Sequence, residues 1–203
     1  MNKLVSLVLS VIMFLCPSLN IPHTDADASA ASGRQFVFVN GLGGWGEYQL
    51  YYKILPYWGV FGGDCMTYLR ARGFDVHAAS ASSSSSAWDR ACEVYAQLTG
   101  TTVDYGEAHS ERYGHDRFGK CYRGRALVKQ WDADHPIDLL GHSFGGATVL
   151  MLLDLMIDGS EEERAKTPPD GLSPLFAGGH DGWISSITAL SAPLNGTTAY
   201  YAA

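Results

Sequence analysis

The sequence has few basic residues for its length of 203 residues. It carries 14 Lys and Arg against 21 Asp and Glu, which gives a formal net charge of -7. A protein that binds nucleic acid needs a basic footprint to neutralise phosphates, so this balance argues against nucleic acid as a partner. Hydrophobic residues make up 46% of the chain and charged residues 17%, which excludes a disordered protein and allows one domain with a real core.

Long hydrophobic runs are also missing. The longest, Leu4–Leu15, is too short to span a bilayer comfortably, and it follows the positive charge of Lys3. Small and polar residues come next and end in two Ala-x-Ala patterns, Ala26–Ala28 and Ala28–Ala30. This order predicts a cleaved secretory signal over residues 1–30, and therefore secretion, with an N-terminal membrane anchor as the alternative.

Cysteine is scarce, with four in the whole chain. Cleavage near residue 30 leaves Cys65, Cys92 and Cys121. An odd number cannot form a complete disulfide framework, so we expect either one bridge with a spare thiol or three buried thiols. No Cys-x-x-Cys spacing is present, which argues against a zinc site made of thiolates.

Predicted strands alternate with predicted helices along the chain. Short runs rich in β-branched and aromatic residues predict strands at residues 35–39, 74–77, 137–140 and 183–190. Helical patterns cover residues 62–72, 88–98 and 144–157, and a capping box at Ser160–Glu163 begins a further helix that Pro168 ends. Residues 80–86 are expected to form a flexible surface loop, and residues 100–125 a long loop region. The alternation predicts an α/β fold with a mainly parallel sheet.

A Gly-x-Ser-x-Gly pattern, Gly141–Gly145, lies between the predicted strand 137–140 and the predicted helix 144–157. Strand, tight turn and buried helix form the context of a nucleophile elbow, in which the serine has a strained backbone and glycines let neighbouring chain pass close. An ordinary glycine-rich turn is the simpler interpretation, and a phosphate-binding loop would need a lysine that is missing here. The context favours Ser143 as a nucleophile.

A serine nucleophile also needs N–H donors that stabilise the oxyanion formed during attack. One donor is expected at Phe144, directly after the serine. The other is expected at Leu42, because the glycine-rich segment 40–44 follows the first predicted strand. A plain tight turn is the alternative interpretation of that segment.

Several further stretches carry a resemblance that spans residues 35–198. They are Phe36–Gly41, Tyr57–Gly59, Trp88–Glu93, Val103–His109, Tyr113–His115, Gly141–Ser143, Leu172–Phe176, Gly178–His180 and Asn195–Thr198. Together they resemble the secreted, zinc-containing bacterial triacylglycerol lipases of the Bacillus/Geobacillus and Staphylococcus type. The resemblance implies an α/β-hydrolase fold, with residues 31–203 as the N-terminal part of the lipase domain, truncated after the strand at 183–190. It implies hydrolysis of carboxylic esters, acylglycerols at a lipid–water interface as substrates, and no stable protein partner.

The resemblance assigns the nucleophile to Ser143 and the oxyanion-hole N–H groups to Leu42 and Phe144. In α/β-hydrolases a catalytic acid and then a histidine follow the serine along the chain. The one histidine after Ser143 is His180, which precedes the last predicted strand and aligns with a non-catalytic position. The catalytic acid and histidine of the family are therefore expected later than residue 203.

The resemblance also implies a structural zinc ion held by Asp89, His109 and His115. A carboxylate and two imidazoles suit a closed tetrahedral zinc site. Without the resemblance, two loop histidines six residues apart are usually solvated side chains. The fourth zinc ligand of the family is an acidic residue later than residue 203, and calcium, which full-length relatives can bind, has no expected ligands in this chain.

Asn40 departs from the family pattern, which usually has histidine there, and so does Leu194-Asn195, where His-Asp is common. Neither change removes a backbone donor.

Two explanations remain for the catalytic acid and histidine that we do not find in this sequence. The chain is either a partial product of a full lipase, or a truncated, catalytically inactive homologue that binds zinc or lipid. Acyl transfer to an alcohol other than water would use the same serine, and a peptidase rests only on shared nucleophile chemistry.

Overall fold

The structure is a computed structural model that describes residues 33–59 and 63–197, so the predicted secretory signal lies outside the described residues. Its centre is a four-stranded sheet with the strand order β2-β1-β5-β6. The strands are β1 (Gln35–Val39), β2 (Asp75–Ala79), β5 (Ile137–His142) and β6 (Ile184–Leu190). All three pairings are parallel, which confirms the predicted parallel sheet.

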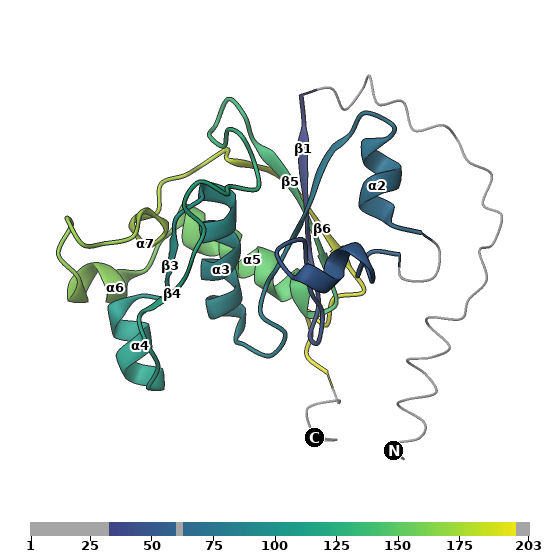
Figure 1. Cartoon of the computed structure of the whole chain (residues 1–203). Helices are drawn as coiled ribbons and strands as arrows, with labels where there is room; N and C mark the ends of the chain where they lie inside the picture. The colour runs from purple at the N-terminus through teal and green to yellow at the C-terminus, as the bar shows by residue number, and fades with distance from the viewer. Residues whose placement is uncertain (1–32, 60–62, 198–203) are drawn as a thin grey trace, which may run out of the picture.

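Helices cover both faces of this sheet. In Figure 1, α3 and α5 lie on one side of the strands and α2 lies on the other. The helices are η2 (Leu50–Lys53, a 3-10 helix), α2 (Cys65–Arg70), α3 (Ala87–Thr99), α4 (Glu107–Tyr113), α5 (Phe144–Ile157), α6 (Glu161–Lys166) and α7 (Pro174–Ala177). The architecture is therefore α/β, as the alternation of apolar patterns predicts.

Strand β1 supplies side chains to two separate cores because successive residues of a strand point to opposite faces. Val37 and Val39 are fully buried in the cluster that α3 and α5 form. Phe36 and Phe38 pack against the other cluster, which contains Met66 of α2. Packing on both faces explains why residues 36–39 are all apolar, and it holds the end of β1 in place.

The edge strand β6 contains a β-bulge. Ile184 pairs with Ile137, but the next pair is Ser186 with Asp138, so β6 has one extra residue. The extra residue changes which face the following side chains occupy. It lets Ile184 and Ile187 both pack against the core that contains α5.

The prediction of a long loop over residues 100–125 is wrong. This region contains an antiparallel pair of strands, β3 (Thr102–Asp104) and β4 (Phe118–Cys121), with α4 between them. These elements are at most seven residues long. Such short segments show no periodicity, and contacts with distant parts of the chain stabilise them.

The serine-rich segment 80–86 is only partly the flexible surface loop that composition predicts. Ser80 and Ala81 are buried, and the amide of Ser80 donates to Gln97 Oε1 at 2.7 Å. The amide of Ser82 donates to Glu93 Oε2 at 2.6 Å. Helix α3 therefore holds the start of this segment, whereas Ser83 and Ser84 are exposed.

The described cysteines are all free, so the expected bridge among them is wrong. Cys92 is buried, and burial raises the pKa of its thiol. Cys65 is half-buried and Cys121 is exposed, so the alternative of three buried thiols fails as well.

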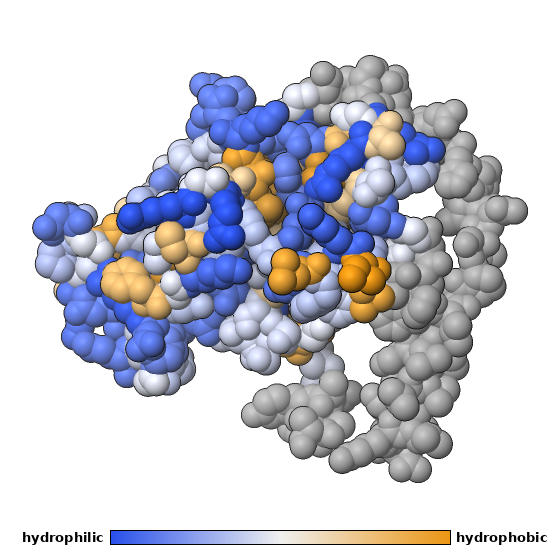
Figure 2. Space-filling view, viewed as in Figure 1, coloured by the Kyte–Doolittle hydropathy of each residue, from blue (hydrophilic) through white to orange (hydrophobic). Residues whose placement is uncertain are grey.

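Apolar side chains gather over η2 on the face seen in Figure 2. Leu50 is 94% exposed and Ile54 is 87% exposed, so both lie outside the two cores.

Within the described residues, no helix combines the length and apolar character needed to cross a membrane.

Candidate functional site

Ser143 occupies a strained turn between β5 and α5. Its φ of 52° and ψ of -126° place it in a region that residues other than glycine rarely adopt, at a cost of about 1–3 kcal/mol. The amide of Ser143 donates to the carbonyl of Leu190 in β6 at 2.9 Å, and the amide of Gly146 donates to the carbonyl of Ser143 at 3.0 Å. The side chain is half-buried. This geometry is the strand–turn–helix arrangement that the Gly-x-Ser-x-Gly pattern predicts.

The glycines of the pattern allow close contact between backbone segments. A Cβ on Gly145 would lie 2.3 Å from the carbonyl oxygen of Val39, and a Cβ on Gly141 would lie 2.3 Å from the carbonyl oxygen of Gly145. A Cβ on Gly146 would lie 2.3 Å from the Cβ of Ala192. The beginning of α5 therefore rests directly on the end of β1.

Segment 40–44 passes beside the serine turn. A Cβ on Gly41 would lie 2.9 Å from the Cβ of Ser143. In this segment the amide of Gly43 donates to Ser83 and that of Gly44 donates to Gly41, whereas the amide of Leu42 has no acceptor among the described residues. The amide of Phe144 is also available, because the first N–H groups of a helix have no partner inside it. The two expected oxyanion donors thus belong to segments that meet at Ser143.

Tyr57 links segment 40–44 to the strand that carries the serine. Its hydroxyl accepts a hydrogen bond from the amide of Gly41 at 3.1 Å and lies 2.6 Å from Nδ1 of His142. The bond from Gly41 uses one lone pair of the hydroxyl oxygen, so the hydroxyl proton is available to Nδ1 of His142. Burial lowers the pKa of His142. The sequence alone indicates no role for Tyr57, although the residue begins one of the stretches that resemble the lipases.

His180 does not contact the serine. Its Nε2 lies 3.0 Å from the carbonyl oxygen of Pro174, and its ring lies against Trp183. Among the described residues, no histidine is hydrogen-bonded to the hydroxyl of Ser143. The geometry therefore supplies a strained serine and two available N–H groups, and it assigns no proton acceptor.

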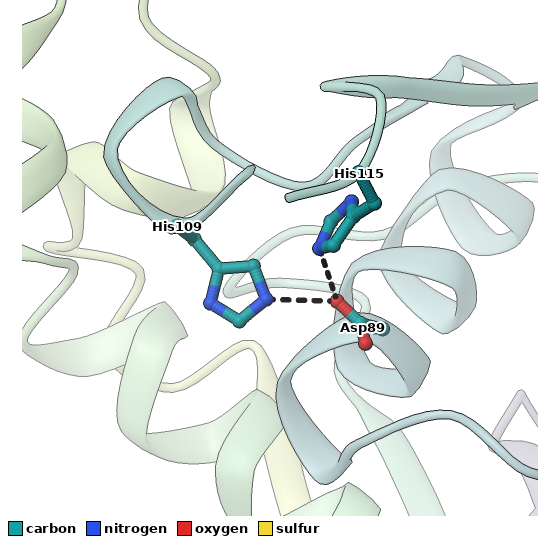
Figure 3. Close-up of side chains that lie close together, drawn as sticks. All are labelled: Asp89, His109 and His115. Carbon is teal, nitrogen blue, oxygen red and sulfur yellow. Dashed lines mark hydrogen bonds and ion pairs between the residues drawn. The ribbon is translucent and has the colours of Figure 1, made fainter. Parts of the chain in front are cut away.

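Asp89, His109 and His115 come together in a second site, shown in Figure 3. Oδ1 of Asp89 lies 2.9 Å from Nε2 of His109 and 3.7 Å from Nε2 of His115. Asp89 is in the first turn of α3 and His109 is in α4. Gly114 ends α4 in the left-handed region, with φ of 72°, and this turn brings His115 back toward Asp89. All three ligand atoms lie within 4.8 Å of one another.

The rings around this cluster orient it. The imidazole of His109 stacks on Trp88, with centroids 5.0 Å apart and an interplanar angle of 10°. Nδ1 of His115 lies 2.9 Å from the carbonyl oxygen of Asp116, which leaves Nε2 for Asp89. Burial lowers the pKa of His109, and the carboxylate of Asp89 opposes this shift.

Glu163 fixes the helix that carries His109. Helix α4 begins after Gly106, which has no side chain to cap it. The buried carboxylate of Glu163 caps it instead, accepting the amides of Ala108 at 3.0 Å and His109 at 2.8 Å. The capping box predicted at Ser160–Glu163 is thus only half right: Ser160 caps α6 as expected, but the Glu163 side chain turns to α4.

The comparisons with known proteins agree with this architecture. The family model for the lipase-like C-terminal domain matches residues 33–202. The chain is 41% identical over 145 residues to Lipase 2 of Staphylococcus aureus, covering 70% of this chain and 21% of that protein. It is also 41% identical over 167 residues to a lipase of Staphylococcus hyicus, covering 81% of this chain and 25% of that protein.

Solved structures show the same relationship. EstA from Clostridium botulinum superposes with a TM-score of 0.77 at 40% identity, covering 84% of this chain and 38% of that chain. The crystal structure of Staphylococcus hyicus lipase gives a TM-score of 0.74 at 38% identity, covering 84% of this chain and 44% of that chain. The chain spans a quarter or less of the length of the two curated relatives. The identities to these proteins confirm the predicted resemblance to staphylococcal lipases. The chain belongs to the family of the lipase-like C-terminal domain.

Proposed function

We propose that this chain belongs to an α/β-hydrolase that hydrolyses carboxylic esters, with acylglycerols at a lipid–water interface as substrates. The observation that carries the proposal is the backbone of Ser143, strained at φ 52° between β5 and α5, beside an amide of Leu42 that has no acceptor among the described residues. Related proteins are named lipases. The segment over residues 1–30 supports secretion.

In the proposed reaction, Oγ of Ser143 attacks the carbonyl carbon of the ester. The carbonyl oxygen becomes an oxyanion, which accepts hydrogen bonds from the N–H groups of Leu42 and Phe144. The carbon–oxygen bond to the alcohol then breaks, and water hydrolyses the acyl-serine. The proton of the serine passes to a general base, which then gives it to the leaving alcohol.

Ester turnover tests the proposal. A purified preparation of the protein that contains this chain should release fatty acid from a triolein emulsion and p-nitrophenol from p-nitrophenyl butyrate. An acyl group trapped on Ser143 by acid quenching during turnover would identify the nucleophile. A folded protein without turnover of any ester, and without covalent chemistry at Ser143, would favour the catalytically inactive zinc- or lipid-binding remnant.

We also propose that Asp89, His109 and His115 hold a structural zinc ion. Ligands about 2.0–2.2 Å from a tetrahedral zinc lie about 3.4 Å from one another. The separations of 2.9 Å and 3.7 Å from the Asp89 oxygen lie on either side of that value, and one carboxylate with two imidazoles is a suitable donor set. The ion would cross-link α3 to α4 and would take no part in the ester chemistry.

Zinc should raise the melting temperature of the metal-free chain. Free zinc at ~100 times its Kd stabilises the folded state by about 2.7 kcal/mol. For a chain of this size, that stabilisation corresponds to a shift of about 5–10 °C. The H109A variant should lose most of the shift, measured by thermal unfolding followed by circular dichroism. The matched control is H135A, because His135 is exposed and pairs with Asp132 outside the cluster. An equal zinc-induced shift in H109A and the unsubstituted chain would contradict the site.

A further inference from the structure

Arg90 is a fully buried cation in α3, with no exposed surface. It takes part in none of the ion pairs among the described residues. Burying a charge is costly unless hydrogen bonds compensate it, so such a residue must have well-placed acceptors. The identity of those acceptors indicates what Arg90 does.

The guanidinium of Arg90 donates to three segments of the chain. One terminal nitrogen, Nη2, donates to the carbonyl of Asn40, and the other, Nη1, donates to the carbonyl of Ser82. Nε donates to Oγ1 of Thr148 in α5 at 2.9 Å. Three acceptors, each bonded to a different nitrogen of one guanidinium, fit the rigid fork of arginine, and the single ammonium of lysine cannot reproduce them.

Each of these acceptors supports a part of the Ser143 site. Asn40 begins segment 40–44, which carries the amide of Leu42. Ser82 precedes Ser83, whose carbonyl accepts the amide of Gly43 at 2.8 Å. Thr148 lies one turn after Phe144 and donates to its carbonyl at 3.1 Å. One side chain therefore joins the segments that carry both expected oxyanion donors.

The side chain of Asn40 complements this arrangement. Its Nδ2 donates to the carbonyl of Ala81 at 3.1 Å, and its Oδ1 accepts the amide of Ala81 at the same distance. The side chain thus ties segment 40–44 to the segment that follows β2, and the main-chain carbonyl of Asn40 remains for Arg90. The guanidinium carbon of Arg90 also lies 5.6 Å from the centre of the Phe144 ring.

We propose that Arg90 is a positioning residue that sets the distance between the Leu42 and Phe144 amides, and so shapes the oxyanion hole for the ester chemistry of Ser143. This inference rests on the proposed function. Arg90 does not touch the substrate and acts through Asn40, Ser82 and Thr148. A displacement of about 1 Å in such a site can reduce the rate about 100-fold.

Two measurements on R90K test the role of Arg90. The first is amide hydrogen exchange at Gly43, which reports whether segment 40–44 remains bonded to Ser83. The second is the rate of Ser143 labelling by a fluorophosphonate, divided by the rate with the analogue that carries a P=S in place of the P=O. Sulfur accepts hydrogen bonds weakly, so this ratio reports on the two amides and not on folding. We expect faster exchange at Gly43 and a ratio reduced about 10- to 100-fold.

The matched control is R34K. Arg34 makes a two-point ion pair with Asp138 at the opposite end of β1, so this variant should change neither the exchange of Gly43 nor the ratio. If R90K does not fold, T148V removes one acceptor with little change in shape and should shift both measurements in the same direction. Unchanged exchange at Gly43, or an unchanged ratio, would overturn the role of Arg90. All variants are made in the protein that contains this chain, and failure of the unsubstituted protein to label at Ser143 would instead contradict the proposed function.

Discussion

The S143A variant is expected to lose covalent labelling by an alkyl fluorophosphonate. In the unsubstituted protein that contains this chain, Oγ of Ser143 attacks phosphorus, fluoride leaves and the hydroxyl proton passes to the general base that serves the ester reaction. The phosphonyl oxygen then accepts the amides of Leu42 and Phe144, as an ester oxyanion would. Alanine removes the attacking oxygen, so the adduct should fall to background in intact-mass spectrometry. Ester turnover by the same preparation should fall by roughly 10⁴- to 10⁶-fold.

Ser191 offers a matched control for this experiment. It is the other described residue besides glycine with a positive φ, of 50°, and it is exposed. It follows β6 and does not begin a helix, so its amide surroundings differ from those of Ser143. S191A should label as fast as the unsubstituted chain. Labelling that persists in S143A, or that disappears in S191A, would show that the nucleophile is elsewhere.

Local patterns in the sequence predict much of the fold. The run at 35–39 and the helix at 144–157 match β1 and α5 residue for residue, because both are strongly apolar and have clear boundaries. Helix α4 has no such signal. Its cap, Glu163, lies 55 residues from Ala108 in the sequence, so a local interpretation of 100–125 could not detect it.

The two candidate sites differ in how far the sequence predicts them. The Ser143 turn follows from adjacent residues, because the strand, the glycines and the helix are contiguous. The cluster at Asp89 depends on residues 20 and 26 positions apart, and only the family resemblance indicates it. Arg90 lies inside a matching stretch, but its contact with Thr148 spans 58 residues, and an arginine in a helix is usually interpreted as solvent-exposed.

The G145A variant is expected to destabilise the fold despite the better helix propensity of alanine. Alanine in a helix interior is favoured over glycine by about 1 kcal/mol. Here the new Cβ would lie 2.3 Å from the carbonyl oxygen of Val39 and 2.7 Å from that of Asn40. Both are backbone atoms at the end of a strand that is buried on both faces, so they cannot move as a flexible side chain does. We expect a net loss of about 3 kcal/mol in the free energy of unfolding, measured by urea denaturation.

The matched control is G171A, because a Cβ at Gly171 would meet its nearest atoms at 3.6 Å and 3.7 Å, which are ordinary contacts. That variant should stay within about 0.5 kcal/mol of the unsubstituted chain. The pair separates a general effect of alanine from the local clash, since both substitutions add the same methyl group. If G145A were as stable as G171A, then α5 would not rest on the end of β1. The amides of Leu42 and Phe144 would then lack the fixed spacing that an oxyanion hole requires.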